Sequence, residues 1–207
     1  MAEKLEFTLS GSSSHTAKLF KYILYNILLQ RNVYPDDDFE IERCEGMNHM
    51  AISDPEVKQY VETLIQQIDQ WAKRQELERV AIALTSVDTL EVIERWTFFV
   101  KTKGDAVMTE DTLSEQAGRR QQDFQSQMRR LIVQILNINN ILPILDPNNV
   151  TFEVYVYTVK GAEEHPRWMR TDDAPIIQGD TEHARLTDID TADCNVRSFV
   201  SYKKPAF

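Results

Sequence analysis

Hydrophobic side chains recur at helical spacing in two early stretches of the chain. Apolar positions within residues 17–28 and 57–71 repeat every three or four residues, which is typical of one buried face of an α-helix. Asp54, Pro55 and Glu56 mark the start of the second helix. Aspartate caps a first turn, proline fits its geometry, and glutamate lies at the positive end of the helix dipole. The pattern therefore predicts two amphipathic helices before residue 75.

A third helical stretch covers residues 121–142, with apolar side chains on several faces. A helix that is apolar nearly all round is buried on more than one side. This stretch is therefore predicted to be the central helix of the core, ended by Pro143. The preceding residues 101–118 are polar, without periodicity and with two glycines, and predict a mobile loop.

Strand patterns fill much of the remaining chain. Residues 39–43 and 47–52 predict one pair of strands, and the β-branched runs 80–84 and 92–100 predict a β-hairpin. The strand after the third helix covers residues 151–158. Its side chains separate into two faces, with Phe152, Val154 and Val156 on one and Tyr155 and Tyr157 on the other. Helices and strands together predict an α+β fold.

The 48-residue tail from Lys160 combines charges, prolines and short strand-like runs, and it is expected to lie over the sheet as a covering segment.

The 207 residues fit one domain. No stretch is long and apolar enough to span a membrane, and the first residues lack a signal-peptide pattern. Two widely separated cysteines, Cys44 and Cys194, favour a reducing compartment.

The net charge of −10 argues against binding to duplex nucleic acid, which requires a basic face, and fits attraction of a basic peptide. The four histidines are scattered, and none has a metal-ligand spacing with an acid or a cysteine. No phosphate-binding loop, dinucleotide fingerprint or nucleophile elbow occurs. We therefore expect no metal, no cofactor and no enzymatic activity. An enzyme with an unrecognised site remains an alternative, because triads assemble in space.

Several motifs in order along the chain resemble the HORMA-domain family. Residues 20–35, FKYILYNILLQRNVYP, are similar to its first helix and turn, and residues 94–98, ERWTF, resemble the ERWxF strand of its spindle-assembly-checkpoint branch, the mitotic arrest deficient 2 family. Gln134-Ile135 with Leu142-Pro143 resembles the end of its third helix. Residues 200–203 with Pro205 resemble its C-terminal strand. The resemblance covers nearly the whole chain and is weakest in residues 101–118.

The resemblance implies a fold of three helices against an antiparallel sheet, with a mobile C-terminal "safety belt". It divides the single domain 1–207 into a core, 1–158, and a belt, 159–207. In the closed form of the family, the belt locks an extended partner peptide against the strand after the third helix. The implied partners are a coiled-coil kinetochore receptor and the β-propeller activator of the anaphase-promoting complex, whose inhibition delays anaphase. The implied locations are nucleus, kinetochore and cytoplasm.

The residues expected to contact the peptide lie on three parts of the chain. They are Phe152, Val154, Tyr155, Val156 and Tyr157 on the strand, Trp71 and Trp168, and Tyr202 and Lys203 near the end of the belt. Trp71 and Trp96 also fit a simple role in the core, and Tyr155 and Tyr157 fit a solvent-facing strand.

The family also has a self-association surface, to which Arg31, Val133, Gln134 and Ile141 correspond. The family's arginine and aromatic residue are replaced by Val133 and Ile141, and its basic belt residue by Thr187, so we expect weak or altered dimerisation between open and closed forms. An adaptor subunit of a translesion DNA polymerase, from the same family, is the alternative function.

Overall fold

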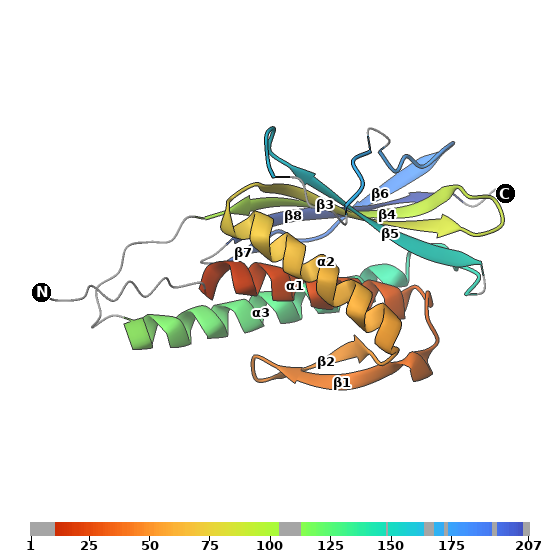
Figure 1. Cartoon of the computed structure of the whole chain (residues 1–207). Coiled ribbons are helices and arrows are strands. Elements are labelled where there is room, and N and C mark those ends of the chain that lie inside the picture. The colour runs from red at the N-terminus through yellow and green to blue at the C-terminus, as the bar shows by residue number, and fades with distance from the viewer. Residues whose placement is uncertain are drawn as a thin grey trace, which may run out of the picture.

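The computed structural model describes residues 11–103, 113–147, 149–163, 168–171, 174–191 and 194–204. Three long helices lie on one face of a twisted antiparallel sheet, and a separate two-stranded hairpin lies beyond the helices (Figure 1). The helices are α1 (Gly11–Gln30), α2 (Pro55–Lys73) and α3 (Leu113–Asn139), and a short 3-10 turn, η1, covers Asp36–Asp38. The predicted α+β fold with three helices on an antiparallel sheet is confirmed.

Local sequence signals explain the boundaries of the first two helices. The Asp54 carboxylate accepts hydrogen bonds from the backbone N–H groups of Glu56 and Val57, which caps α2 as predicted. After α1, Asn32 adopts a left-handed conformation with φ 51°, which ends the helix before Pro35. The strong apolar period of α2 buries Val61, Leu64, Ile68 and Trp71.

The central helix is α1, so the prediction that residues 121–142 form it is wrong. Helix α1 packs against both α2 and α3, and its side chains from Leu19 to Leu28 are almost all buried. On α3, Val133 and Leu136 are 47% and 41% exposed, so this helix has one buried face only. The apolar stretch of α3 therefore includes an exposed apolar surface as well as core positions.

Helix α3 also begins earlier than predicted, at Leu113 rather than residue 121. Of the predicted loop, residues 101–102 belong to β4 and residues 113–118 to α3, and residues 104–112 lie outside the described residues. The first turns of α3 contain Glu115, Gln116 and Ala117, which have high helix propensity but supply no apolar period. A search for hydrophobic periodicity does not detect such a polar start.

The strands follow the predicted hairpins closely. The separate hairpin joins β1 (Phe39–Cys44) to β2 (Met47–Ile52), and the main sheet contains β3 (Leu77–Ser86), β4 (Val92–Thr102) and β5 (Val150–Thr158). Strands β3 and β4 pair directly, with Ile82 opposite Trp96. Inward side chains of both strands pack on the helices, and Trp96 is fully buried, as expected for a core residue.

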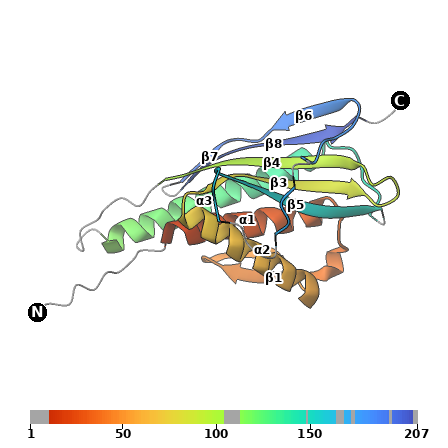
Figure 2. The same ribbon diagram turned by 45° about the horizontal axis from the view of Figure 1, so that its top comes forward.

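The C-terminal part of the chain completes the sheet. It forms β6 (Thr181–Arg185), β7 (Ile189–Asp190) and β8 (Cys194–Lys203), and the order across the sheet is β5-β3-β4-β8-β6, with β7 paired to β8 (Figure 2). Val196 and Val200 of β8 are fully buried in the core. The prediction of a tail that only covers the sheet is therefore wrong for its second half, because β8 is an inner strand.

Candidate peptide-binding edge of the sheet

Strand β5 forms one edge of the main sheet. Among the described strands it pairs with β3 alone, from Leu77↔Thr158 to Ser86↔Val150. In an antiparallel sheet, alternate residues of an edge strand direct their backbone N–H and C=O groups away from the neighbouring strand. These groups are available to an extended peptide that adds a strand to the sheet.

The two predicted faces of β5 are confirmed. Phe152, Val154 and Val156 lie opposite Leu84, Ile82 and Val80 of β3, whose side chains are buried on the helix side. The three β5 side chains are only half-buried because they lie at the edge. A peptide paired with β5 would cover this remaining apolar surface.

An aromatic cluster lies on the helix side of the beginning of β5. The Phe152 ring contacts Tyr34 at 6.2 Å and Tyr60 of α2 at 5.9 Å between centroids, both edge-to-face. Tyr60 is 48% exposed. Burial raises the pKa of the Tyr60 phenol, and Glu153 raises it further. Burial also raises the pKa of Tyr34, with contributions from Asp54 and Asp38.

The two tyrosines of β5 lie on the opposite face, away from the helices. The Tyr155 hydroxyl donates to Glu153 Oε2 at 2.7 Å. The Tyr157 ring is covered by the Arg79 guanidinium, whose Cζ lies 3.6 Å from the ring centroid. Asp38 and Asp54 lie near Tyr34, which contacts Phe152, and Glu153 lies on β5 itself, whereas a guanidinium lies by the last half of the strand. This charge distribution favours the basic end of a peptide near Phe152.

Residues 159–180, which we call the crossing segment, connect β5 to the strands on the opposite side of the sheet. Its first part is held by the end of α2. Trp71 Nε1 donates to the Glu163 carbonyl at 3.3 Å, and Arg74 forms an ion pair with the Glu163 carboxylate. The rings of Trp71 and Trp168 meet edge-to-face at 5.2 Å. The two predicted tryptophans are therefore brought together, with Trp71 5% exposed.

The second part of the crossing segment is held at the beginning of β4. Arg95 Nη1 donates to the Pro175 carbonyl at 2.8 Å, and Ile177 forms an isolated parallel bridge with Val92. Pro175 and Ile177 are both buried. The described parts of the crossing segment are therefore attached at two places, the end of α2 and the beginning of β4.

The structure does not bring Tyr202 and Lys203 to the edge formed by β5, and their contact with a peptide stays a prediction. They belong to β8, which β3 and β4 separate from β5. Tyr202 donates to Glu182 at 2.8 Å, and Lys203 forms an ion pair with Glu91 at 2.6 Å. Hydrogen bonding to Glu182 raises the pKa of the Tyr202 phenol. Both residues hold β8 in place.

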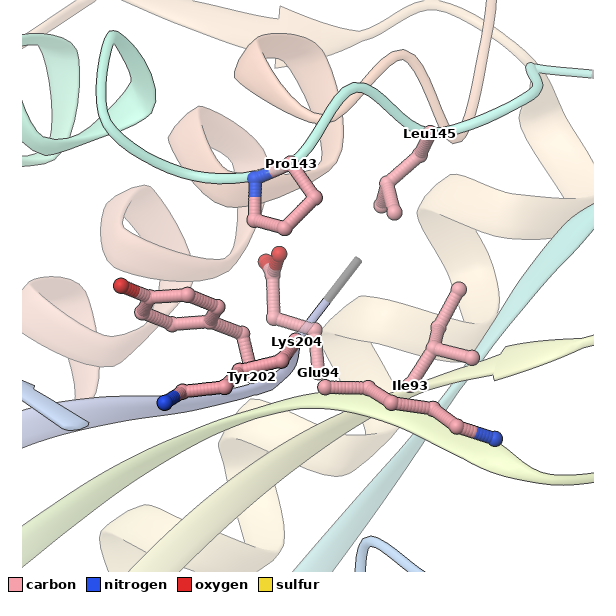
Figure 3. A pocket seen from close by; sticks show the side chains of 7 residues that line it. Ile93, Glu94, Pro143, Leu145, Tyr202 and Lys204 are labelled. Carbon is pink, nitrogen blue, oxygen red and sulfur yellow. The ribbon is translucent and has the colours of Figure 1, made fainter. Parts of the chain in front are cut away.

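These two residues also line a small cavity of about 180 Å³ between β8, the start of β4 and the loop after α3 (Figure 3). The other lining residues are Ile93, Glu94, Pro143, Leu145 and Lys204. In Figure 3 the Glu94 carboxylate points from β4 towards Pro143. The cavity is largely apolar and lies apart from the open edge of β5.

The carboxylate of Glu94 forms a buried ion pair with Arg31 at the end of α1. Arg31 Nε donates to both carboxylate oxygens at 3.0 Å, and its Nη atoms donate to Asn139 Oδ1 at 2.7 Å and the Pro143 carbonyl at 2.6 Å. Trp96 Nε1 donates to Glu94 at 2.7 Å. Burial raises the pKa of the Glu94 carboxyl, and the charge of Arg31 opposes this shift.

The four residues of the expected self-association surface are therefore in different surroundings. Arg31 is 5% exposed and fully engaged, while Val133 and Ile141 are 47% and 63% exposed. Gln134 Oε1 accepts a hydrogen bond from the Thr187 backbone at 2.6 Å, which ties α3 to the C-terminal strands. Their role in dimerisation stays a prediction.

Sequence reasoning missed the residues that hold the crossing segment and flank β5, namely Tyr34, Tyr60, Arg79, Arg95 and Ile177. Tyr60 was detectable as part of the α2 period, but its contact with Phe152 depends on long-range packing. Among the described residues, no cluster of three metal-ligating side chains is present. In the same part of the chain, no helix has the length and hydropathy needed to cross a bilayer.

Comparison with known proteins identifies the family. The HORMA domain family model matches residues 12–192. The mitotic spindle checkpoint component mad2 of Schizosaccharomyces pombe is 31% identical over 97% of this chain and 96% of its own length. The mitotic spindle assembly checkpoint protein MAD2A of Mus musculus is 27% identical over 99% and 97%.

Solved structures give the same result. A chain in the crystal structure of the mitotic checkpoint complex superposes with a TM-score of 0.78 at 30% identity, covering 94% of this chain and 99% of that one. Caenorhabditis elegans HTP-2, bound to a HIM-3 closure motif, has a TM-score of 0.70 at 13% identity and shows the shared fold, with 93% and 90% coverage. The protein belongs to the HORMA-domain family, in its mitotic arrest deficient 2 (Mad2) spindle-checkpoint branch.

Proposed function

We propose that this protein is a non-catalytic adaptor of the spindle assembly checkpoint that captures an extended segment of a partner protein along β5. The observation that carries the proposal is the open edge of β5 beside a crossing segment attached at two places, at Trp71 and at Arg95. Main-chain hydrogen bonds to β5 supply affinity, and the half-buried side chains of Phe152, Val154 and Val156 supply contacts for alternate peptide side chains.

The captured segment passes between β5 and the crossing segment, so its release requires the crossing segment to detach. Local opening of this kind makes dissociation slow. In this arrangement β8 pairs with β4, which fits the closed form expected for the family. An open form, with residues 159–207 in another position, is its counterpart, and the two packings differ by only a few kcal/mol.

The proposed partners are a coiled-coil kinetochore receptor and the β-propeller activator of the anaphase-promoting complex. The spindle-checkpoint names of the curated relatives and the likeness to a mitotic checkpoint complex chain support this choice. The acidic surroundings of Phe152 favour segments with a basic residue at one end. The proposed sites of action are nucleus, kinetochore and cytoplasm.

The test is binding of synthetic peptides from both candidate partners, followed by hydrogen exchange. The expected result is strong new protection of the β5 amides and of the crossing segment, with slow dissociation. The matched control is the same peptide with prolines at alternate positions, because proline lacks the N–H that strand addition needs. Protection elsewhere in the sheet, or equal binding of the proline peptide, would contradict capture at β5.

A pull-down from cells separates the checkpoint role from the polymerase alternative. Recovery of kinetochore and anaphase-promoting-complex components supports the proposal. Recovery of translesion polymerase subunits alone would replace it with the polymerase-adaptor function.

A variant lacking residues 198–207 is expected to lose retention of the captured peptide, because β8 anchors the end of the belt.

A further inference from the structure

The face of the sheet opposite the helices carries a row of alternating aromatic and cationic side chains. Tyr157 of β5 lies opposite Arg79 of β3, Arg79 lies opposite Phe99 of β4, and Phe99 lies opposite Arg197 of β8. Directly opposite residues of antiparallel strands share a face. The four strands lie side by side in Figure 2. We call these four residues the outer row.

Contacts with aromatic rings hold the side chains of the outer row in place. The Arg79 guanidinium lies between two rings, with its Cζ 3.6 Å from the Tyr157 centroid and 5.6 Å from the Phe99 centroid. Phe99 also stacks on Phe199 of β8, at 6.1 Å and 30° between planes. Cation–π contacts of this kind hold a guanidinium in place without neutralising it.

Sheet stability explains only part of this arrangement. The contact between Arg79 and Tyr157 is an ordinary stabilising cross-strand pair. It does not explain why Phe99 is 43% exposed, nor why Lys101, two residues further along β4, and Arg197 are exposed beside it. An exposed aromatic side chain between cations is typical of a protein interface, where aromatic residues and arginine are enriched.

The charge of this face differs from that of the whole protein. Arg79, Lys101 and Arg197 carry three positive charges in a chain of net charge −10. Among the described residues, none of the three forms an ion pair with a carboxylate. Two carboxylates on neighbouring strands have other partners, since Asp190 of β7 pairs with Lys103 and Glu153 of β5 accepts from Tyr155.

We propose that the outer row, with Lys101 and Phe199, docks an acidic segment of a protein partner that is distinct from the peptide captured at β5. The cations attract carboxylates, and Phe99 with Phe199 receives an apolar or aromatic side chain between them. Four strands spaced about 4.8 Å apart give the row a length of about 14 Å, which an extended segment of about four residues spans. A nucleic-acid strand is disfavoured because its phosphates continue beyond the row and meet the net negative charge of the rest of the protein, whereas a segment of about four residues ends within the row.

The test is a peptide array in which a frame of aspartate and glutamate carries one phenylalanine, tyrosine, tryptophan or leucine at each position in turn. The full chain is expected to bind a subset of these peptides, with amide NMR shifts confined to the four strands of the outer row, β5, β3, β4 and β8. The double variant Lys101→Glu/Arg197→Glu is expected to weaken this binding about tenfold or more, as is Phe99→Ser.

The matched control is Arg129→Glu/Arg130→Glu, which makes the same charge change at exposed positions of α3, on the other side of the sheet. Capture of the β5 peptide by each variant reports that it is folded and that the proposed function is intact. Unchanged binding by the control supports the proposal. Equal loss by the control, no binding of any array peptide, or tighter binding of an oligothymidine strand would overturn it.

Discussion

Strands β5 and β8 take equivalent places on either side of the β3–β4 hairpin, yet they are embedded very differently. Strand β8 pairs with β4 along nine residue pairs, from Glu94↔Tyr202 to Thr102↔Cys194, and its other side is covered by β6 and β7. Strand β5 pairs with β3 over a similar length and has no second partner among the described strands. Strand β8 is therefore an inner strand of the sheet, whereas β5 is an edge strand.

The burial of side chains follows the same division. Val196 and Val200 of β8 are fully buried, whereas Phe152, Val154 and Val156 of β5 are half-buried. Burial of apolar area is the main stabilising contribution in folding. The comparison teaches that β8 is fixed by the core itself, while β5 retains surface that a bound strand would cover.

The largest effect is expected at the ion pair beneath β8. Glu94→Ala leaves the Arg31 guanidinium buried without its carboxylate, so we expect a loss of about 3–5 kcal/mol in the free energy of unfolding. Glu153→Ala on the exposed side of β5 should change it by no more than about 0.5 kcal/mol. Urea unfolding of both variants measures the difference, and equal losses would show that the two sides are not distinct.

A second pair of variants compares identical substitutions on the two strands. Val200→Ala removes fully buried methyl groups from β8 and is expected to cost about 2 kcal/mol. Val154→Ala removes the same atoms from the half-buried face of β5 and is expected to cost about 1 kcal/mol. Saturating the protein with the captured peptide should raise the cost at Val154 and leave that at Val200 unchanged. If Val154→Ala lowers the free energy of unfolding equally with and without the peptide, the peptide does not contact Val154.

The third prediction concerns the attachment of the crossing segment to α2. Trp168→Ala removes the edge-to-face contact with Trp71, which is worth about 1 kcal/mol beyond area burial. The captured peptide should then dissociate several-fold faster, measured by displacement of a fluorescent peptide. Met169→Ala is the control, because the neighbouring Met169 is 90% exposed. Equal dissociation rates for the two variants would remove Trp168 from the retention mechanism.

The smallest expected effect concerns the pH dependence of stability, which should be the same for variants of β5 and of β8. His49 of the separate hairpin stacks on Tyr22 of α1, with 3.8 Å between the ring centroids. Burial lowers the pKa of the His49 imidazole from its ordinary value of 6.5. Lys21 contributes in the same direction, and Glu42 and the Cys44 backbone oppose it. The unfolded chain therefore binds the proton more readily than the folded one. Stability is full above about pH 6.5 and falls as the pH drops from there towards the folded pKa.

His49→Phe keeps a ring on Tyr22 and removes the titration, so its stability should depend less on pH in this window. Chemical denaturation at several pH values measures the slope. An unchanged slope would mean that other groups carry the acid sensitivity. The β5 and β8 variants should all retain the wild-type slope, because His49 touches neither strand.

The sequence predicted elements well where their signals are local. The start of α2 was predictable because Asp54 and Pro55 carry their own capping chemistry, and the two faces of β5 follow from simple alternation. The order of helices in the layer was not predictable, because the apolar periods of α1 and α3 do not state which helix lies between the others. Exposed Val133 and Leu136 made α3 resemble a central helix.

The site was predictable only in part for the same reason. The motif resemblance pointed to β5 and to the two tryptophans, and their contact across almost 100 residues is present in the structure. It could not show that Tyr202 and Lys203 lie three strands away from β5, because that depends on which edge receives β8. The contacts of Arg95 with Pro175 and of Arg31 with Glu94 likewise join residues without any local pattern.

The position of β8 has a consequence for synthesis on the ribosome. A nascent chain that has emerged only to the end of β7 contains β4 but lacks the strand that pairs with its outer edge. Until residues 194–203 leave the exit tunnel, the β4 backbone is a template for intermolecular pairing. A chaperone that shields β4 until β8 has emerged would therefore protect the unfinished domain from aggregation.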